Sequence, residues 1–274
     1  MLLYPNAKIN IGLKVVAKRD DGYHDIETIF YPLQLSDKLS IEKSIESFSF
    51  YQNGITLDCD LESNLIVKTY RLFQKKYDIG NVRIQFFKQI PFGAGLGGGS
   101  SDAAHTAIAL NELFHLQLSK EQLIEDVKLI GADCPFFILN QPCLATGIGD
   151  QLKPISLVLS NLKIVLVKPD VSVNTKTAYK GICPKMPDTS LSRLISLPVE
   201  QWKDKVINDF ESTVFTAFPK IAEIKNELYD LGAIYASMSG SGASVYALFK
   251  NDKTFDENAI KNKFIDSFVY VQTC

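Results

Sequence analysis

Residues 91–104 read Pro-Phe-Gly-Ala-Gly-Leu-Gly-Gly-Gly-Ser-Ser-Asp-Ala-Ala, and they include five of the sixteen glycines of the chain. Glycine at positive φ lets backbone N–H groups approach a ligand without a Cβ in between, and the two serines add hydroxyl donors. Apolar residues then recur at three- and four-residue steps from Ser101 to about Leu116, which predicts a helix. Because the positive end of that helix would face the glycines, we predict a phosphate-binding loop.

Other kinds of glycine loop fit this spacing less well. Gly93-x-Gly95-x-x-Gly98 matches the dinucleotide fingerprint and follows a strand-like run at 82–90, but no acidic residue ends a second strand about twenty residues later. No lysine follows the glycines, so the loop is not a P-loop. A turn without a ligand is the remaining alternative, and the entropic cost of five interior glycines weighs against it.

Length and composition indicate a globular protein of two packed domains. The chain has 274 residues, 46% hydrophobic and 22% charged, with a net charge of −2. This charge predicts no binding to nucleic acid or membranes. The first residues lack the features of a signal peptide, and no apolar run reaches the length of a bilayer span, so we expect a cytoplasmic protein. The expected partner is a small molecule, and the expected state is a monomer or weak homodimer.

The cysteines predict neither a disulfide framework nor a zinc site. They are odd in number, scattered and outside any Cys-x-x-Cys pattern, so we expect reduced thiols that lie mostly in the core. Their positions are Cys59, Cys134, Cys143, Cys183 and Cys274.

Two strands at the amino terminus are predicted to form a hairpin. Residues 7–15 alternate with period two, which places Lys8 and Asn10 together on the face opposite the apolar residues. A solvated strand face is the ordinary interpretation of such a pattern. The Asp-Gly turn at 21–22 leads into a second strand at 26–33, and the hairpin tip carries Tyr23 and His24.

The middle of the chain alternates short strands and helices. Residues 40–57 predict two strands around the turn signal Gln-Asn-Gly at 52–54, and residues 64–77 predict a helix with Asn64 as its N-cap. A capping box at Ser119 opens a further helix to about residue 130. Asp133 then precedes an apolar run at 136–139, predicted to be a strand, where a carboxylate must be capped, paired or functional.

The last part of the chain predicts a ferredoxin-like domain. Strands at 162–167, 233–238, 244–249 and 268–272 and helices at 220–231 and 257–264 follow the order β-α-β-β-α-β. We therefore divide the chain into domains 1–154 and 155–274. Between the middle strands, residues 237–244 read Ser-Met-Ser-Gly-Ser-Gly-Ala-Ser, which suggests a second place where backbone approaches a ligand.

Three of these motifs resemble those of the GHMP family of small-molecule kinases: Ala7-Lys-Ile-Asn10, the loop at 91–101, and Ser239-Gly-Ser-Gly-Ala243. The resemblance covers essentially the whole chain. It implies an α+β fold, with an amino-terminal ATP-binding domain like domain 2 of ribosomal protein S5 and a ferredoxin-like carboxy-terminal domain. The motifs at 19–24 and 131–135 resemble most the member that phosphorylates a cytidine diphosphate-linked methylerythritol on its 2-hydroxyl, in non-mevalonate isoprenoid synthesis.

The resemblance also implies roles for single residues. Asp133 would be the catalytic aspartate, and Lys8 would position it and the substrate hydroxyl. The cofactors would be ATP and Mg²⁺, with Ser100 as a possible metal contact. The residues that would bind ATP are Asn64, Lys88, Pro91, Phe92, Gly93, Ala94, Gly95, Leu96, Gly97, Gly98, Gly99, Ser100 and Ser101. The residues that would bind the substrate are Asn10, Tyr23, His24, Thr175, Tyr179, Ser239 and Gly240.

Two other functions stay open on the sequence. A sister kinase acting on a mevalonate- or homoserine-type alcohol would keep the three loops but has no use for the Tyr23–His24 pair. A non-catalytic nucleotide-binding module would keep the glycines and tolerate the loss of Asp133 or Lys8, and both residues are present. A purely structural Asp133 that caps backbone N–H groups is the alternative at that position.

Overall fold

The structure of the chain is a computed structural model that describes residues 1–56 and 60–274. Its contacts group into two units that each draw on separate stretches of the chain. Unit 1 comprises residues 1–8, 32–92 and 97–141, and unit 2 comprises residues 9–31, 93–96 and 142–274. The amino-terminal strands and the glycine loop thus contribute to both units. A single division of the chain between residues 154 and 155 stays a prediction.

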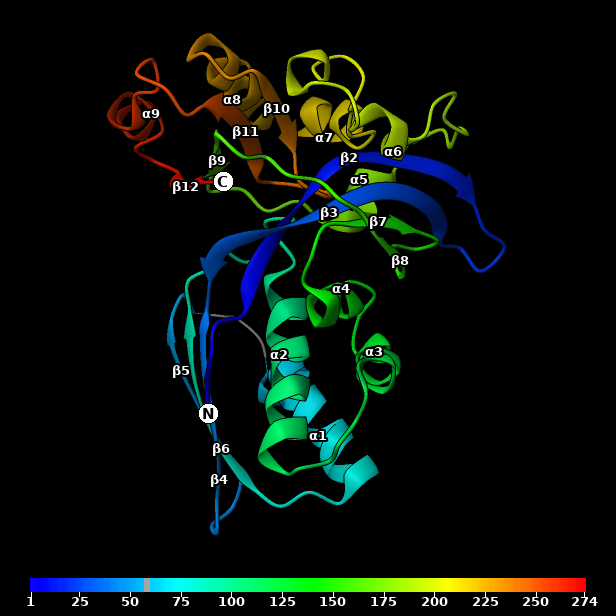
Figure 1. The fold of residues 1–274 in the computed structure, drawn as a ribbon, viewed down its shortest axis with the longest axis vertical. Helices are drawn as coiled ribbons and strands as arrows, with labels where there is room; N and C mark the ends of the chain where they lie inside the picture. The colour runs from blue at the N-terminus through cyan, green and yellow to red at the C-terminus, as the bar shows by residue number, and fades with distance from the viewer. Residues whose placement is uncertain (57–59) are drawn as a thin grey trace. The chain divides into compact units, whose positions relative to one another are not determined.

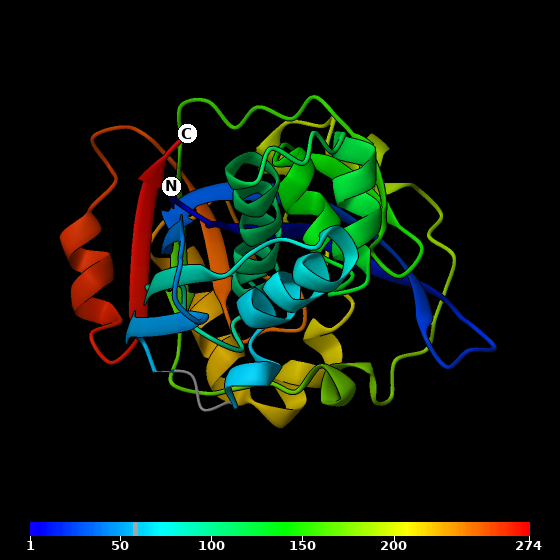
Figure 2. The same cartoon turned by 90° about the horizontal axis from the view of Figure 1, so that it is seen from below.

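Unit 1 holds a four-stranded sheet with helices against it (Figure 1). The strand order is β1 (Leu2–Leu3), β4 (Lys38–Lys43), β6 (Val82–Lys88) and β5 (Ser49–Gly54). Its helices are α1 (Leu65–Tyr77), α2 (Gly98–Leu113), α3 (Lys120–Lys128) and α4 (Cys134–Leu139), with a 3-10 turn at Leu61–Ser63. Helices α1 and α2 lie side by side, as Figure 2 shows, and α2 packs against β4.

The predicted caps define the helix starts in unit 1. The Asn64 side chain accepts a hydrogen bond from the backbone N–H of Ile66 and begins α1. Ser119 and Gln122 form the predicted capping box of α3. These predictions were correct because a cap depends on residues only a few positions apart.

Two predictions about unit 1 were wrong. Residues 136–139 belong to helix α4 (Cys134–Leu139) and do not form a strand. Pro135 stands in the first turn of this helix, and residues 136–138 are buried. A short buried helix and a buried strand look alike in sequence. The Gln-Asn-Gly signal at 52–54 is no turn but the end of β5, which pairs in parallel with β6. A Cβ on Gly54 would lie 2.2 Å from the Lys88 carbonyl oxygen, so close strand contact requires this glycine. Leu57, the predicted end of the strand pair, lies outside the described residues.

A second sheet has the order β2 (Asn6–Lys18), β3 (His24–Ser36), β7 (Cys143–Thr146) and β8 (Gln151–Pro154). Strands β2 and β3 are the predicted hairpin, and each is longer than predicted. Lys8 and Asn10 stand two residues apart on β2 and are both buried, so the face they share is not a solvated one.

Unit 2 also contains the predicted ferredoxin-like sheet. Its strand order is β10 (Tyr235–Met238), β11 (Val245–Lys250), β9 (Leu162–Lys168) and β12 (Phe268–Thr273), and all its pairs are antiparallel. This is the order expected for a β-α-β-β-α-β chain. Its helices are α8 (Pro219–Asp230) and α9 (Glu257–Lys263). Between β9 and α8 lie α5 (Thr175–Tyr179), α6 (Leu191–Leu194), a 3-10 turn at Val199–Gln201, and α7 (Glu211–Ala217).

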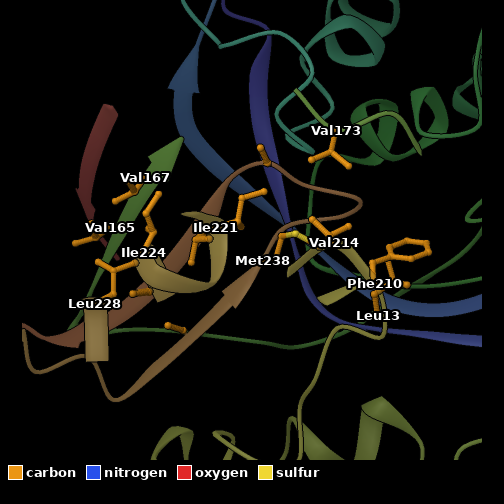
Figure 3. Packing of buried hydrophobic residues seen from close by; sticks show 14 of the residues in the cluster. Leu13, Val165, Val167, Val173, Phe210, Val214, Ile221, Ile224, Leu228 and Met238 are labelled. Atoms are coloured by element: carbon orange, nitrogen blue, oxygen red, sulfur yellow. The ribbon is translucent and has the colours of Figure 1, made fainter. Parts of the chain in front are cut away.

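The core of unit 2 forms between α8 and the sheet (Figure 3). Ile221, Ile224 and Leu228 recur along one face of α8, and Val165 and Val167 project from alternate positions of β9 toward them. Complete burial of such a side chain contributes about 1.5–3 kcal/mol. This apolar core holds together the sheet whose β10–β11 connection is the small-residue loop at 239–244.

No helix within residues 1–56 and 60–274 is long and apolar enough to cross a membrane. Among the described cysteines, Cys134 and Cys143 are buried, Cys183 is exposed and Cys274 is partly buried, and all are free thiols. Cys59 lies outside the described residues.

Candidate active site

A buried lysine and a partly exposed aspartate form an ion pair in unit 1. Lys8 Nζ lies 3.3 Å from Asp133 Oδ2, and the side chains are 4% and 33% exposed. Strand β2 supplies the lysine, and the turn before α4 supplies the aspartate. The pair therefore combines a fixed cation with a carboxylate that a solvent-borne molecule can reach.

Asp133 stands at the N-cap position of α4, yet its side chain makes no capping hydrogen bond. Its backbone is in the right-handed helical region, whereas a capping residue is usually extended. The ion pair with Lys8 engages the carboxylate instead. The structure therefore gives no support to the alternative in which Asp133 serves as a helix cap.

The glycine loop needs positive φ at three alternate positions. Gly93, Gly95 and Gly97 have φ of +61°, +72° and +68°, a region that residues with a side chain rarely adopt. Gly98 and Gly99 are already helical and form the start of α2. The loop thus ends at Gly97, the N-cap of a sixteen-residue helix.

The first backbone donors of α2 have no partner within the helix. The Ser101 N–H makes the first helical hydrogen bond, to the Gly97 carbonyl oxygen at 2.9 Å. The N–H groups of Gly98, Gly99 and Ser100 precede it and have no partner inside the helix. The Ser101 hydroxyl lies 3.3 Å from His105 Nδ1, within the helix, so Ser100 is the serine whose hydroxyl stays at the helix start.

Gly97, at the end of the loop, packs against the lysine of the ion pair. A Cβ built on it would lie 3.0 Å from Lys8 Cε and 2.9 Å from the Phe137 ring. The stem of Lys8 therefore packs directly on the Gly97 backbone. The positive end of α2, the lysine and the aspartate form one cluster within unit 1.

In unit 2, the loop at 239–244 supports the glycine loop. The Ser239 hydroxyl donates to the Gly95 carbonyl oxygen at 2.8 Å, and the Ser244 N–H donates to the Ala94 carbonyl oxygen at 3.2 Å. A Cβ on Gly95 would lie 2.1 Å from the Ser239 carbonyl oxygen. The backbone that Ser239-Gly-Ser-Gly-Ala243 approaches is thus that of the glycine loop.

Asn10 and Asn208 fix this supporting loop. The Asn10 N–H donates to Ser239 Oγ at 3.2 Å, and its Oδ1 would lie 3.2 Å from a Cβ on Gly240. Asn208 Nδ2 donates to the carbonyl oxygens of Met238 and Gly240, both at 2.8 Å. Ser239 is fully buried, and its hydroxyl holds the Gly95 carbonyl oxygen.

Four of the residues predicted to bind the substrate, His24, Tyr179, Tyr23 and Thr175, belong to unit 2. The His24 ring stacks on the Tyr179 ring with centroids 4.6 Å apart, and Phe210 meets Tyr179 edge-on. Tyr23, at the hairpin tip, is 62% exposed. The Thr175 hydroxyl lies 3.2 Å from that of Ser241, which joins α5 to the loop at 239–244.

Asn174 has a definite local role. Its side chain accepts a hydrogen bond from the Lys176 N–H and caps α5, the helix that carries Tyr179. This cap fixes the start of α5, and therefore the position of Tyr179 at the end of the helix.

Lys88 and Asn64 have structural partners in unit 1. Lys88 is 3% exposed, and its Nζ lies 2.6 Å from Asp37 Oδ2 and 2.7 Å from Asp102 Oδ2. Burial by itself lowers the pKa of Lys88, but the two carboxylates outweigh it and the pKa is raised. Asn64 caps α1. Contact of either side chain with ATP stays a prediction.

Oxygen donors suited to magnesium are present near the ion pair. Ser100 Oγ would lie 3.8 Å from a Cβ on Gly131, two residues before Asp133. Hydroxyl and carboxylate oxygens are ligands that Mg²⁺ accepts together with phosphate oxygens. Within residues 1–56 and 60–274, no group of three or more His, Cys, Asp or Glu side chains is arranged to hold a metal ion.

Three contributors were missed in the sequence: Asp37, Asp102 and Asn208. Asp37 follows the end of β3, Asp102 is the one charged residue among the small residues that begin α2, and Asn208 lies in an irregular segment. Each acts on a residue far away in the chain, so no local spacing could have identified it.

Comparison with known proteins identifies the family to which this chain belongs. The model described as "GHMP kinases N terminal domain" matches residues 64–141, and "GHMP kinases C terminal" matches residues 196–266. A protein of Parabacteroides distasonis named 4-diphosphocytidyl-2-C-methyl-D-erythritol kinase is 47% identical over 98% of both chains. The two family matches lie on either side of residue 154.

Solved structures agree with this. A crystal structure of 4-(cytidine 5'-diphospho)-2C-methyl-D-erythritol kinase covers 99% of this chain and 98% of its own, with a TM-score of 0.84 and 30% identity. The Methanococcus jannaschii mevalonate kinase, at 13% identity and a TM-score of 0.73, shares the fold. The predicted family and the α+β fold class are confirmed. The chain therefore belongs to the GHMP kinase family of ATP-dependent small-molecule kinases.

Proposed function

We propose that this kinase transfers the γ-phosphoryl group of ATP to the 2-hydroxyl of 4-diphosphocytidyl-2-C-methyl-D-erythritol, in the non-mevalonate route to isoprenoid precursors. The names of its relatives support this substrate. The observation that carries the chemistry is the Lys8–Asp133 ion pair lying against Gly97, at the end of the phosphate loop.

Asp133 is the proton acceptor in this proposal. The substrate's tertiary alcohol is a weak acid, so its proton passes to the carboxylate as the new bond from oxygen to phosphorus forms. ADP leaves with the electron pair of the broken bond, and the proton later passes from Asp133 to solvent. The Lys8 ammonium orients the carboxylate through their 3.3 Å contact and stabilises negative charge that develops beside it.

The phosphates of ATP are held at the start of α2. The free N–H groups of Gly98, Gly99 and Ser100 point out of the positive end of a sixteen-residue helix, which favours an anion. Mg²⁺ bound with ATP would neutralise part of the phosphate charge, with Ser100 and Asp133 as the oxygen side chains able to face it. We propose the rest of residues 91–101 as the wall of this phosphate site.

Unit 2 supplies the residues proposed to recognise the cytidine diphosphate portion. The stacked rings of His24 and Tyr179 offer an aromatic face and a hydrogen-bonding edge, which suit a pyrimidine. The Tyr23 side chain is exposed, and we propose that it also contacts the bound pyrimidine. Binding of this remote nucleotide provides energy that holds the hydroxyl in line for transfer. Asn10, Thr175 and Gly240 are proposed to contact the substrate, and Ser239 acts through Gly95.

An ADP-release assay over a panel of alcohols tests the substrate. The cytidine-bearing alcohol should be phosphorylated far faster than free methylerythritol, mevalonate or homoserine. Faster turnover of mevalonate or homoserine would establish the sister-kinase alternative. Lack of turnover with every alcohol, together with normal ATP affinity, would favour the non-catalytic module.

The Asp133→Asn variant tests the mechanism. It is nearly isosteric but takes no proton, so kcat should fall by orders of magnitude while both KM values change little. Lys8→Ala should be severely impaired, and the double variant should be little worse than either single one, because the two residues act as a unit. Turnover of Asp133→Asn at the parent rate would refute its role as the base.

A further inference from the structure

Three charged side chains lie buried together beneath the start of α2. Lys88 ends β6, Asp37 follows β3, and Asp102 lies in the second turn of α2, and each is at most 3% exposed. Lys88 Nζ touches both carboxylates, at 2.6 and 2.7 Å. We call Asp37, Lys88 and Asp102 the ionic triad.

The triad fixes the residues that enter the phosphate loop. Asp37 Oδ1 accepts the backbone N–H of Gln89 at 2.6 Å and of Ile90 at 2.8 Å. Gln89 Nε2 also donates to the Ser36 carbonyl oxygen at 3.0 Å. The backbone directly before Pro91 is thus tied to the β3–β4 connection at two consecutive residues.

The same lysine fixes the residues that leave the loop. Lys88 Nζ binds Asp102 on α2, and a Cβ on Gly98 would lie 3.0 Å from that Nζ. One ammonium group therefore contacts the helix on which the loop ends, while its partner Asp37 holds the strand end from which the loop begins. The triad therefore contacts the chain at both ends of the loop.

The two carboxyl groups of the triad share one ammonium group. Burial raises the pKa of Asp102 well above its usual range, although Lys88 opposes the shift. Asp102 Oδ1 has no hydrogen-bond partner within the described residues, so it is the oxygen that can carry the proton. With Asp102 protonated, Lys88 and Asp37 form one ion pair and the triad is neutral.

Buried ion pairs add little net stability compared with apolar residues of similar volume, because desolvation costs about as much as the attraction returns. Their directed bonds do define geometry. We infer that the ionic triad is a clamp that sets the separation of the two ends of the phosphate loop and so determines affinity for the phosphate chain of ATP. Lys88, Asp37 and Asp102 are in this view positioning residues.

The inference rests on the proposed use of residues 91–101 for ATP, and it differs from a direct contact between Lys88 and adenine. The clamp predicts that its loss weakens binding of ATP but not of adenosine, which has no phosphates. A contact with adenine predicts equal losses for both ligands. Calorimetric affinities for ATP and adenosine separate the two.

Three variants and one control carry the experiment. Lys88→Met and Asp102→Leu remove the link to α2, and each should lower ATP affinity at least tenfold while adenosine affinity changes less than twofold. Asp102→Asn keeps an acceptor oxygen for Lys88 in the same place, so it should retain the parent affinity for ATP. Asp126→Asn is the matched control, since Asp126 is a buried aspartate of unit 1 bonded to Lys76 and Tyr77. It should lower the melting temperature and leave ATP affinity unchanged.

Parent-like ATP affinity in folded Asp102→Leu would overturn the clamp, as would equal loss of ATP and adenosine binding in Lys88→Met. If Lys88→Met does not fold, the comparison of Asp102→Leu with Asp102→Asn decides. A parent enzyme without measurable ATP affinity would overturn the proposed function as well, so the two failures are distinguishable.

Discussion

Replacing Gly95 with alanine should disrupt the glycine loop far more than the same change at Gly93. Both residues have left-handed φ, +72° and +61°, so each alanine meets a backbone cost of about 1–2 kcal/mol. The surroundings differ. A Cβ at 95 would lie 2.1 Å from the Ser239 carbonyl oxygen, whereas a Cβ at 93 would lie 3.5 Å from Ser172 Oγ, an ordinary contact.

The clash at Gly95 involves backbone on both sides, so no side-chain rotation relieves it. Overpacking of this kind costs about 1–3 kcal/mol more, which gives about 2–5 kcal/mol for Gly95→Ala against about 1–2 kcal/mol for Gly93→Ala. Because the loop must move away from Ser239, the KM for ATP should also rise in Gly95→Ala.

Urea unfolding followed by tryptophan fluorescence measures this difference. The chain has one tryptophan, Trp202, which is buried and belongs to unit 2, as do Gly93, Gly95 and Ser239. Equal free energies of unfolding for the two variants, within about 0.5 kcal/mol, and equal KM values for ATP would refute the argument that contact with Ser239 is what requires glycine at position 95.

Two further predictions concern substrate recognition and the thiols. His24→Ala should raise the KM for the cytidine-bearing substrate about ten- to a hundredfold, since a lost buried polar partner costs about 1–3 kcal/mol, while ATP affinity stays constant. Tyr179→Phe keeps the stacked ring and should change that KM little; unaltered cytidine discrimination in His24→Ala would contradict the assignment. Burial raises the pKa of Cys134 to about 12, so at pH 8 this residue remains a thiol, and exposed Cys183 should react with iodoacetamide before Cys134 does. Peptide mass mapping checks this order, and faster labelling of Cys134 would disprove it.

Much of the fold could be predicted from local patterns. The caps at Asn64 and Ser119, the helix after the glycine loop and the β-α-β-β-α-β order each depend on residues a few positions apart. Where periodicity was ambiguous, prediction failed: the apolar run at 136–139 is part of a helix, and the Asn-Gly signal ends a parallel strand. The parallel partner β6, distant in the chain, decides the second case, and burial removes the periodicity in the first.

The candidate site, like the fold, could be predicted from the sequence only in part. The sequence by itself determined that a glycine loop needs positive φ before a helix start, and the Lys8 and Asp133 motifs identified the pair that the structure brings to 3.3 Å. Only the tertiary structure decided which residue packs against each glycine and leaves no room for a Cβ. Lys8 packs against Gly97, and Ser239 packs against Gly95.

The tertiary structure also decided that Lys88 is buried between two carboxylates. Its partner Asp37 is 51 residues away, and the Ser239–Gly95 hydrogen bond spans 144 residues. Helix caps and strand alternation arise from interactions within a few residues, so they leave a spacing in the sequence. Hydrogen bonds and ion pairs between distant segments leave none, because their geometry exists only once the chain has folded.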